Sequence, residues 1–389
     1  MSFDQEFFRN NRLRLMIEHP GSLIFVAANT PMQRSGDSCF PFRQDSNFWY
    51  LTGIDEPNLL LVLDTIKNQE TLILAEKTEI EEIFDGPTNV FELNKISGIK
   101  TIISSKDSET LLKNIPSGQK VYLNLAKNRP NMAVNPHRQE VQKKIKAYSK
   151  KISDIRPSLD HLRMVKQPVE IAAIKKASEV TKEILKLVSL EIENGIESEA
   201  TVFNFINSQL ASRGLTHAYE PIVASGKNSL TLHYIKNNSL INSRTKALLI
   251  DCGVEYNHYC ADISRTFTLN SDKTATKLIE ALKITQARII DALKPGMQWK
   301  ELHKLSEQIM IEELQFVGEK VDSQTIKQYY PHAIGHHLGL DVHDTGDYRK
   351  PLTENMVVTI EPGYYNPKNE FGIRVEDDVL VTSSGAVIL

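Results

Sequence analysis

Cysteine is scarce in this sequence. Cys39, Cys252 and Cys260 are the three cysteines among 389 residues, and no CxxC pair occurs. So small and odd a number excludes a disulfide framework. For Cys252 and Cys260 a small buried side chain is the simpler interpretation, so we expect no catalytic thiol. The composition favours a reducing, cytoplasmic setting.

Long apolar runs and an excess of one charge are missing as well. Runs such as residues 59–63 are far shorter than the ~20 residues of a membrane span. The first residues, MSFDQEFFRNNR, carry acids where a signal peptide has a basic start and an apolar stretch. Lys and Arg number 46 against 49 Asp and Glu, a net charge of −3. We therefore expect no membrane span, no export and no nucleic-acid partner.

Two common catalytic motifs are also absent. No HExxH occurs, which excludes the helical zinc-protease arrangement. The segment ASGKNS, residues 224–229, lacks the GxxxxGK[ST] spacing of a phosphate-binding loop. The sequence therefore implies neither that class of protease nor a nucleotide.

The first third of the chain alternates short apolar runs with polar or helical connections. A helix is predicted over residues 4–18, ended by Pro20 and Gly21. This alternation is typical of an α/β domain. The aperiodic residues 149–163 predict a linker with a boundary at Pro157, which gives domains 1–157 and 158–389. Strands are predicted at residues 22–29, 59–63, 71–74, 101–103 and 120–123.

The remainder of the chain shows the same order of elements twice. Each half predicts two helices followed by strands, which suggests one domain with an internal pseudo-twofold. Pro168 suits the first turn of the first helix, and Ser198 suits the N-cap of the second. One predicted helix begins at Pro168, and the other three span 198–214, 274–293 and 299–316. Strand-rich sequence is predicted over 222–269 and 357–389.

Two strand-turn-strand segments each offer a pair of carboxylates. KALLIDCGVEYNHYCADISRTFTL reads as a hairpin centred between residues 256 and 257, which sets Asp251 opposite Asp262. Their Cβ atoms would lie roughly 5 Å apart, and like charges at that distance repel unless a cation lies between them. A hairpin centred between 368 and 369 similarly pairs Glu361 with Glu376. Alternatively, Asp251 merely ends a strand and Asp262 caps a bend.

A histidine cluster supplies a further candidate ligand. One imidazole with four carboxylates suits Mn, Co or Fe(II), with zinc as an alternative. Four carboxylates balance two divalent ions, between which a bridging hydroxide would be the nucleophile of a hydrolysis. Each histidine taken alone is better explained as a surface residue or a hydrogen-bonded core residue, so the prediction depends on the whole set. The histidines of PHAIGHHLGLDVHD are His332, His336, His337 and His343.

The candidate ligands resemble those of the pita-bread metallopeptidases, most closely the Xaa-Pro aminopeptidases (aminopeptidase P). The resemblance rests on Asp251, Asp262, His336, Glu361 and Glu376, in the contexts DCG, ADISRTF, GHHLGLDVHD, TIEPGYY and GIRVEDD. Residues 31–63 are similar to the N-terminal domain of aminopeptidase P and eukaryotic prolidase. The resemblance implies an α/β N-terminal domain and an α+β C-terminal pita-bread (creatinase/aminopeptidase) domain. It further implies that Asp251 chelates one ion, that His336 and Glu361 bind the other, and that Asp262 and Glu376 bridge them. Manganese is the first expectation for both ions.

The same resemblance assigns roles around the metals. It places His233, in LTLHYIKNN, in the active site, and His343 against the tetrahedral intermediate. His332 would line the pocket for proline, and Arg374 would lie beside the metal carboxylates, with Tyr365 as a weaker match. Glu361 is the natural proton acceptor, which makes it both ligand and catalytic residue.

The implied activity is hydrolysis of the N-terminal Xaa-Pro bond of peptides with proline at the second position. The alternatives are an Xaa-Pro dipeptidase (prolidase) and a metal-free pita-bread binding protein. The resemblance also implies a homodimer or homotetramer in which the N-terminal domain can reach a neighbour's active site. Residues at 42, 43 and 48–50 serve either such contacts or the core.

Overall fold

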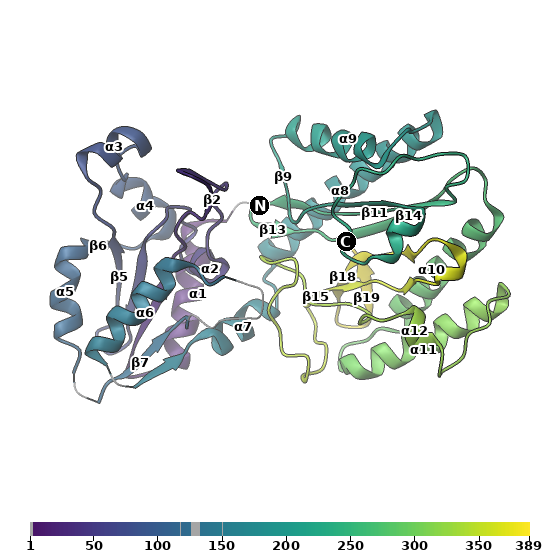
Figure 1. The fold of residues 1–389 in the computed structure, drawn as a ribbon. Coiled ribbons are helices and arrows are strands. Elements are labelled where there is room, and N and C mark those ends of the chain that lie inside the picture. Colours follow the sequence, from purple (N-terminus) through teal and green to yellow (C-terminus); the bar gives the residue numbers. More distant parts are fainter. Residues whose placement is uncertain (1–2, 117, 126–132, 150) are drawn as a thin grey trace. The chain divides into compact units, whose positions relative to one another are not determined.

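The structure is a computed structural model that describes residues 3–116, 118–125, 133–149 and 151–389. Its contacts divide the chain into one compact unit that ends at Leu162 and a second that begins at Arg163 (Figure 1). The predicted linker is not irregular, because residues 152–154 form a strand and Pro157 lies in helix α7 (Arg156–Met164). Proline is compatible with the first turn of a helix, where its missing N–H costs nothing.

The N-terminal unit is built on a six-stranded mixed sheet. β1 is fully buried and lies between β4, with which it is antiparallel, and β7, with which it is parallel. The sheet order is β6-β5-β4-β1-β7-β8. The strands are β1 (Ser22–Ala27), β4 (Leu60–Asp64), β5 (Gln69–Leu74), β6 (Thr101–Ser104), β7 (Lys120–Leu123) and β8 (Ile152–Asp154), with a separate pair β2 (Gln33–Ser35) and β3 (Ser38–Cys39).

Helices connect and cover this sheet. Asp4 caps α1 (Gln5–Glu18) by accepting from the Phe7 amide, so the helix begins where the sequence predicts it. Every residue of α2 (Ser46–Thr52) is buried, so its Phe48, Trp49 and Tyr50 belong to the core. The others are α3 (Glu79–Asp85), α4 (Val90–Ser97), α5 (Ser105–Lys113) and α6 (Pro136–Tyr148).

The first half of the C-terminal unit packs two helices on a three-stranded antiparallel sheet. The sheet order is β10-β11-β14, and the buried side chains of the helices form one core with these strands. Ser198 caps the second helix by accepting from the Thr201 amide. The elements are α8 (Pro168–Asn194), α9 (Glu199–Ala211), β9 (Thr216–His217), β10 (Ile222–Ser225), the 3-10 helix η1 (Gly226–Leu230), β11 (Ala247–Cys252), β12 (Val254–Tyr256), β13 (Tyr259–Cys260) and β14 (Ile263–Thr268).

The second half repeats this order, as the sequence predicts. Helices α10 and α11 lie side by side and share a core with the antiparallel sheet β15-β18-β19 (Figure 1). Each half therefore ends in a three-stranded antiparallel sheet with acidic residues at or near its strand ends. The elements are α10 (Lys273–Ala292), α11 (Trp299–Phe316), α12 (Ile326–Tyr329), β15 (Val357–Ile360), β16 (Gly363–Tyr364), the 3-10 helix η2 (Pro367–Asn369), β17 (Ile373–Arg374), β18 (Asp377–Val381) and β19 (Ala386–Ile388).

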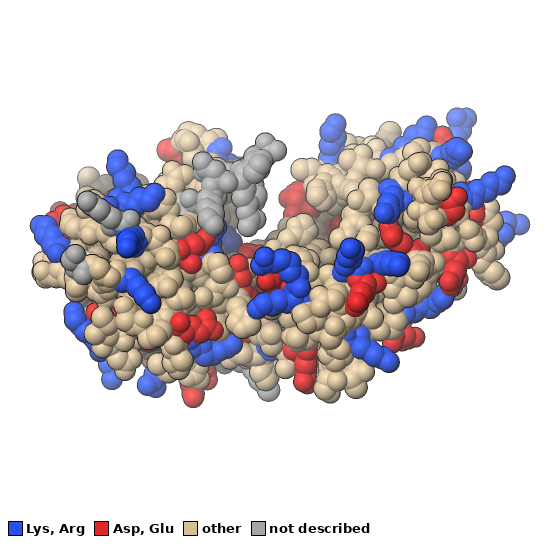
Figure 2. All heavy atoms as spheres, turned by 90° about the horizontal axis from the view of Figure 1, so that it is seen from below, with Lys and Arg blue, Asp and Glu red and all other residues tan. Residues whose placement is uncertain are grey.

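The distribution of charge on the surface and the length of apolar helices bear on nucleic-acid and membrane partners. Figure 2 shows basic and acidic side chains interspersed on the face that it draws. Among the described residues, no helix is both long enough and apolar enough to span a membrane.

Candidate metal centre

The five predicted metal ligands meet in the C-terminal unit. Asp251 lies near the end of β11, and Asp262 lies between β13 and β14. Glu361 directly follows β15, and Glu376 directly precedes β18. His336 lies on a loop, and the residue after it, His337, forms a β-bridge with Val358 of β15. Each sheet thus brings one pair of carboxylates to the site, and the histidine joins them from the loop before the second sheet.

The first carboxylate pair is diagonal, so the predicted pairing of Asp251 with Asp262 is wrong. β11 pairs with β14 so that Asp251 faces Ser264, and Asp262 lies two positions before that serine. The turn falls on Asn257 and His258, whose φ angles of 49° and 68° are both positive. Two-residue turns with positive φ favour Asn at the first position, which moves the hairpin centre by one residue. Asp251 and Asp262 still share one face because positions two apart do.

Tyr219 closes this diagonal. Its hydroxyl lies 2.5 Å from Oδ1 of Asp251 and 2.6 Å from Oδ1 of Asp262. One hydroxyl carries one proton, so only one of these short contacts is a hydrogen bond donated by the tyrosine. The other contact requires a proton on a carboxylate or a cation next to it. This crowding of oxygens fits a metal ion.

The second carboxylate pair has the predicted register. β15 pairs with β18 so that Ile360 lies opposite Asp377, and β16 with β17 continues the same register. Between these two ladders, Glu361 is therefore set opposite Glu376. The prediction of this pair is confirmed because one register runs through both ladders.

The segment that carries His336 lies very close to β15. A Cβ atom at Gly335 would lie 1.9 Å from the carbonyl oxygen of Thr359, so only glycine permits this approach. The amide of Thr359 donates to the carbonyl of His336, and the amide of Glu361 donates to that of Ile334. These backbone bonds set the histidine and the glutamate side by side.

His336 turns one ring nitrogen toward the carboxylates. Its Nδ1 lies 3.0 Å from the carbonyl oxygen of His337, to which it donates. Its Nε2 lies 3.4 Å from Oδ2 of Asp262 and 3.8 Å from Oε1 of Glu361. With the proton on Nδ1, the lone pair of Nε2 is directed to the site, which is the tautomer that a metal ligand needs.

Three overlapping sets of these side chains have ligand geometry. Within each set, one ligand atom from every residue lies within 4.8 Å of the others. Hard oxygen donors with one or two imidazoles suit divalent Mn, Fe, Co or Zn. The residues therefore fit two divalent cations. The sets are Asp251, Asp262 and Glu376; His336, Glu361 and Glu376; and Asp262, His336 and His343.

The electrostatics of the site point the same way. Burial and the neighbouring carboxylates raise the pKa of Asp251 and carry that of Glu376 well above its usual range. Burial raises the pKa of Glu361 to about 7. At Asp262 burial acts upward, but the hydrogen bond and charge of His336 outweigh it and lower the pKa. Burial likewise opposes the rise at His336, whose pKa is nevertheless raised to about 9 by Asp262. A cation would relieve this repulsion.

Arg374 supplies a fixed positive charge beside the carboxylates. Its Nη2 donates to Oδ2 of Asp251 at 2.5 Å, and its Nη1 donates to the hydroxyl of Tyr365 at 3.0 Å. Its Nε donates to Oγ of Ser264 at 2.8 Å, and this serine donates to Oε2 of Glu376 at 2.8 Å. The arginine is buried. Its hydrogen bonds join Asp251 directly, and Glu376 through Ser264, in a single network.

The sequence also predicts three further histidines in this site. Nε2 of His332 lies 3.1 Å from the Tyr365 hydroxyl, and burial lowers the pKa of His332 to about 4. The ring of His343 is exposed and lies 4.3 Å from that of His336. Burial, aided by His336, lowers the pKa of His343. The exposed His233 lies just beyond η1, and its charge contributes to lowering the pKa of both His332 and His343.

Two residues of this site, Ser264 and Tyr219, are not among those that the sequence predicts. Ser264 lies two positions after Asp262, on the same side of its strand, so period-two alternation could have found it. Tyr219 lies in HAYEP before β10, where no periodic pattern marks it. Its place beside Asp251 and Asp262 arises only from the packing of that segment.

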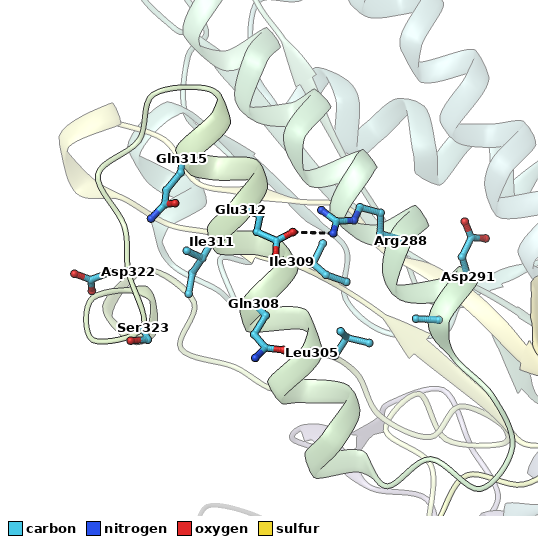
Figure 3. A pocket seen from close by; sticks show the side chains of 11 residues that line it. Arg288, Asp291, Leu305, Gln308, Ile309, Ile311, Glu312, Gln315, Asp322 and Ser323 are labelled. Carbon is cyan, nitrogen blue, oxygen red and sulfur yellow. Dashed lines mark hydrogen bonds and ion pairs between the residues drawn. The ribbon is translucent and has the colours of Figure 1, made fainter.

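A separate groove lies along α10 and α11, with a volume of about 850 Å³ (Figure 3). Its polar wall includes Arg288, which forms an ion pair with Glu312 at 2.7 Å. None of the predicted site residues lines it. The lining residues are Arg288, Asp291, Ala292, Leu305, Gln308, Ile309, Ile311, Glu312, Gln315, Asp322 and Ser323.

Fold and site together define a metal-dependent hydrolase with a carboxylate-rich centre. The chain belongs to metallopeptidase family M24, whose model matches residues 172–383, more than half of its length. The model of the aminopeptidase P N-terminal domain matches residues 8–123. The predicted family and fold class, an α/β domain followed by a pita-bread domain, are confirmed.

Named relatives cover nearly the whole chain. The Xaa-Pro aminopeptidase of Haemophilus influenzae is 30% identical over 99% of this chain and 94% of its own length. The low-pH form of Escherichia coli aminopeptidase P superposes with a TM-score of 0.89 at 26% identity, covering 100% of this chain and 95% of that one. A zinc-substituted form of the same enzyme in complex with product gives a TM-score of 0.88 at 26% identity, with the same coverage. The chain is a metallopeptidase.

Proposed function

We propose that this metallopeptidase removes the N-terminal residue from peptides whose second residue is proline. The names of its relatives support this activity. The observation that carries it is a wall of rings beside the ligand Glu361. The rings of Tyr330 and His332 lie 4.9 Å apart, those of His332 and Tyr365 5.5 Å apart, and the His332 ring reaches Glu361 at 3.5 Å.

Such a wall suits proline for a physical reason. The prolyl nitrogen carries no N–H and the ring fixes φ, so a site that accepts it recognises shape rather than a donated hydrogen bond. Edge-to-face rings such as His332 and Tyr365 present an apolar surface with polar edges. A pyrrolidine ring against this surface would place the scissile carbonyl beside the carboxylate cluster.

The chain's own residues have distinct tasks in this proposal. Bound divalent cations would supply Lewis acidity and activate water. Glu361, whose pKa burial raises to about 7, accepts the proton of the attacking water and returns it to the leaving nitrogen. His343 and His233, both exposed beside the site, donate to the oxyanion that develops on the carbonyl. His336 and the four carboxylates hold the cations.

Three finer points belong to the same proposal. We propose manganese as the physiological metal, since the ligand set is rich in hard oxygen donors, with cobalt, iron or zinc as alternatives. We propose a cytoplasmic location because Cys39, Cys252 and Cys260 are free thiols, a state that a reducing compartment preserves. We also propose a homodimer or homotetramer, which size-exclusion chromatography with light scattering would test.

Matched peptides test the specificity. Xaa-Pro-Xaa should be cleaved with a kcat/KM at least about tenfold above that of Xaa-Ala-Xaa, because the fitted ring aligns the carbonyl in the transition state. Acetylation of the peptide's N-terminus should abolish cleavage, since the free amine is the group that would bind a metal or a carboxylate. Equal kcat/KM for the two peptides, or cleavage of the acetylated one, would show a different hydrolase on this scaffold.

The length of the substrate separates the proposal from its nearest alternative. A prolidase would cleave Xaa-Pro dipeptides and leave the tripeptide Xaa-Pro-Xaa intact. Turnover of the tripeptide supports an aminopeptidase, whereas turnover restricted to the dipeptide supports a prolidase. Bound divalent metal in the purified protein excludes the metal-free binding protein.

Replacing His343 with alanine should separate substrate contact from metal binding. Because its proposed role is toward the oxyanion, the variant should keep both metal equivalents while kcat falls by about a hundredfold. Metal analysis and steady-state kinetics measure the two effects, and His336→Ala, which should lose metal, is the matched control. Loss of one equivalent in His343→Ala would instead make His343 a ligand, as its set with Asp262 and His336 permits.

A further inference from the structure

A fully buried carboxylate outside the metal centre organises the loop that carries His233. Glu199 is the first residue of α9, and its side chain is 0% exposed. Five neutral donors reach its two oxygens at 2.7–2.9 Å. Burying a carboxylate is costly unless its acceptor sites are filled, and here both oxygens are saturated.

The donors come from both sides of the histidine. Oε1 accepts from the amide and the hydroxyl of Ser225 and from the side chain of Asn228, all before His233 in the chain. Oε2 accepts from the Tyr234 hydroxyl at 2.8 Å and from the Ser239 amide at 2.9 Å, both after it. One carboxylate therefore ties together the two arms of the loop between β10 and β11.

The same loop is tied to the strand that bears a predicted ligand. Tyr234, next to His233, packs in a small core with residues 222, 224 and 249 of β10 and β11. In that sheet Ile222 lies directly opposite Asp251. Asn237 adds a second anchor, since it accepts from the Val223 amide at 2.7 Å and donates to a carbonyl before β10 at 2.8 Å. The exposed His233 thus stands on a rigid support that is in register with the metal centre.

We propose that Glu199 is a positioning residue for His233. It has no contact with the reacting atoms; it holds the loop through Tyr234 and so fixes where the imidazole stands. A mispositioned donor loses most of its value because stabilisation of the transition state depends on geometry at the scale of 1 Å. The inference rests on the proposed role of His233 at the oxyanion.

Two variants weaken the hydrogen bonds that Glu199 accepts, to different degrees. Glu199→Gln puts an NH2 group where Oε2 now accepts from a hydroxyl and an amide, so the two hydrogen bonds accepted by that oxygen are lost. Tyr234→Phe removes one hydroxyl and keeps the ring in its core. Glu197→Gln, the same change at an exposed position two residues earlier, is the matched control.

The decisive measurement is a double-mutant cycle with His233→Ala. Alone, Glu199→Gln should lower kcat about thirtyfold and Tyr234→Phe about fivefold, with KM and metal content within twofold of the unmodified enzyme. In the His233→Ala background each should cost less than twofold, because the group that it positions is gone. Equal losses in both backgrounds would overturn the proposal and make Glu199 a purely structural residue.

Hydrogen exchange separates this inference from the proposed function. Amides of residues 226–239 should exchange faster in Glu199→Gln than in Glu197→Gln, whatever His233 does. If His233→Ala alone keeps full activity, the proposed catalytic role of His233 fails while the loop measurement still stands. Unchanged exchange over 226–239 would overturn the positioning inference by itself.

Discussion

Replacing Asp262 with asparagine, or Glu376 with glutamine, is expected to lower kcat/KM by at least about a thousandfold. Both side chains are buried, and both belong to two of the overlapping ligand sets. A neutral amide keeps the shape but cannot offer two anionic oxygens to two cations. In Asp262→Asn the new NH2 group would also face Nε2 of His336, which lies 3.4 Å from Oδ2 in the native site.

Metal content and kinetics should change together in these variants. Elemental analysis is expected to show less than the native metal content, and excess metal in the assay should restore little activity. Glu280→Gln, a comparable change at an exposed position of α10, should leave both unchanged. If both site variants retained bound metal and most of the native rate, the two-metal interpretation of the carboxylates would be wrong.

Removal of metal is expected to make the stability of the protein fall as pH rises from about 7.5 to 9. In the metal-free site burial raises the pKa of Glu361 to about 7 and that of Glu376 well above its usual range, and the pKa of His336 is raised to about 9. A group whose pKa is higher in the folded state stabilises at low pH, and that stabilisation is lost as pH passes its folded pKa. Histidines with lowered pKa, such as His332, bind a proton only in the unfolded state and lose it by about pH 7.5, so above that pH they do not oppose this trend.

Bound divalent cations should reverse the trend. They replace the missing protons at the carboxylates, and they bind more tightly as the ligands deprotonate. The difference in Tm between metal-loaded and chelator-treated protein should therefore widen with pH. Thermal melts at several pH values measure it, and the subtraction cancels Glu170, whose pKa burial also raises to about 7 away from the ligands. A Tm difference independent of pH would contradict this account of the site.

The secondary structure of the catalytic unit was largely readable from the chain. The predicted helix over 299–316 coincides with α11, and the helix predicted from Pro168 is α8, because apolar side chains recur at helical spacing in both. The register of Glu361 with Glu376 was also predictable. There the pairs of β15 with β18 and of β16 with β17 share the register that a centre between residues 368 and 369 predicts.

The register of the first hairpin, which carries Asp251 and Asp262, could not be predicted from the sequence. Its centre depends on which two residues adopt positive φ, and the sequence YNHY allows more than one choice. The expectation that residues 149–163 are irregular was wrong for a related reason, since one proline can either break a helix or begin one. Local sequence leaves such choices open, and packing of the flanking elements decides them.

By itself, the sequence determined the kinds of ligand and their order along the chain. Four acids on strand ends and a histidine in a glycine-containing loop are a chemical statement that holds before any fold is known. Only the tertiary structure decided which groups share the site with them. Tyr219 between two aspartates, Arg374 between the two sheets and Glu199 beneath the His233 loop each join residues from distant segments. Such contacts follow from the packing of two sheets and their helices, and no pattern within one segment encodes them.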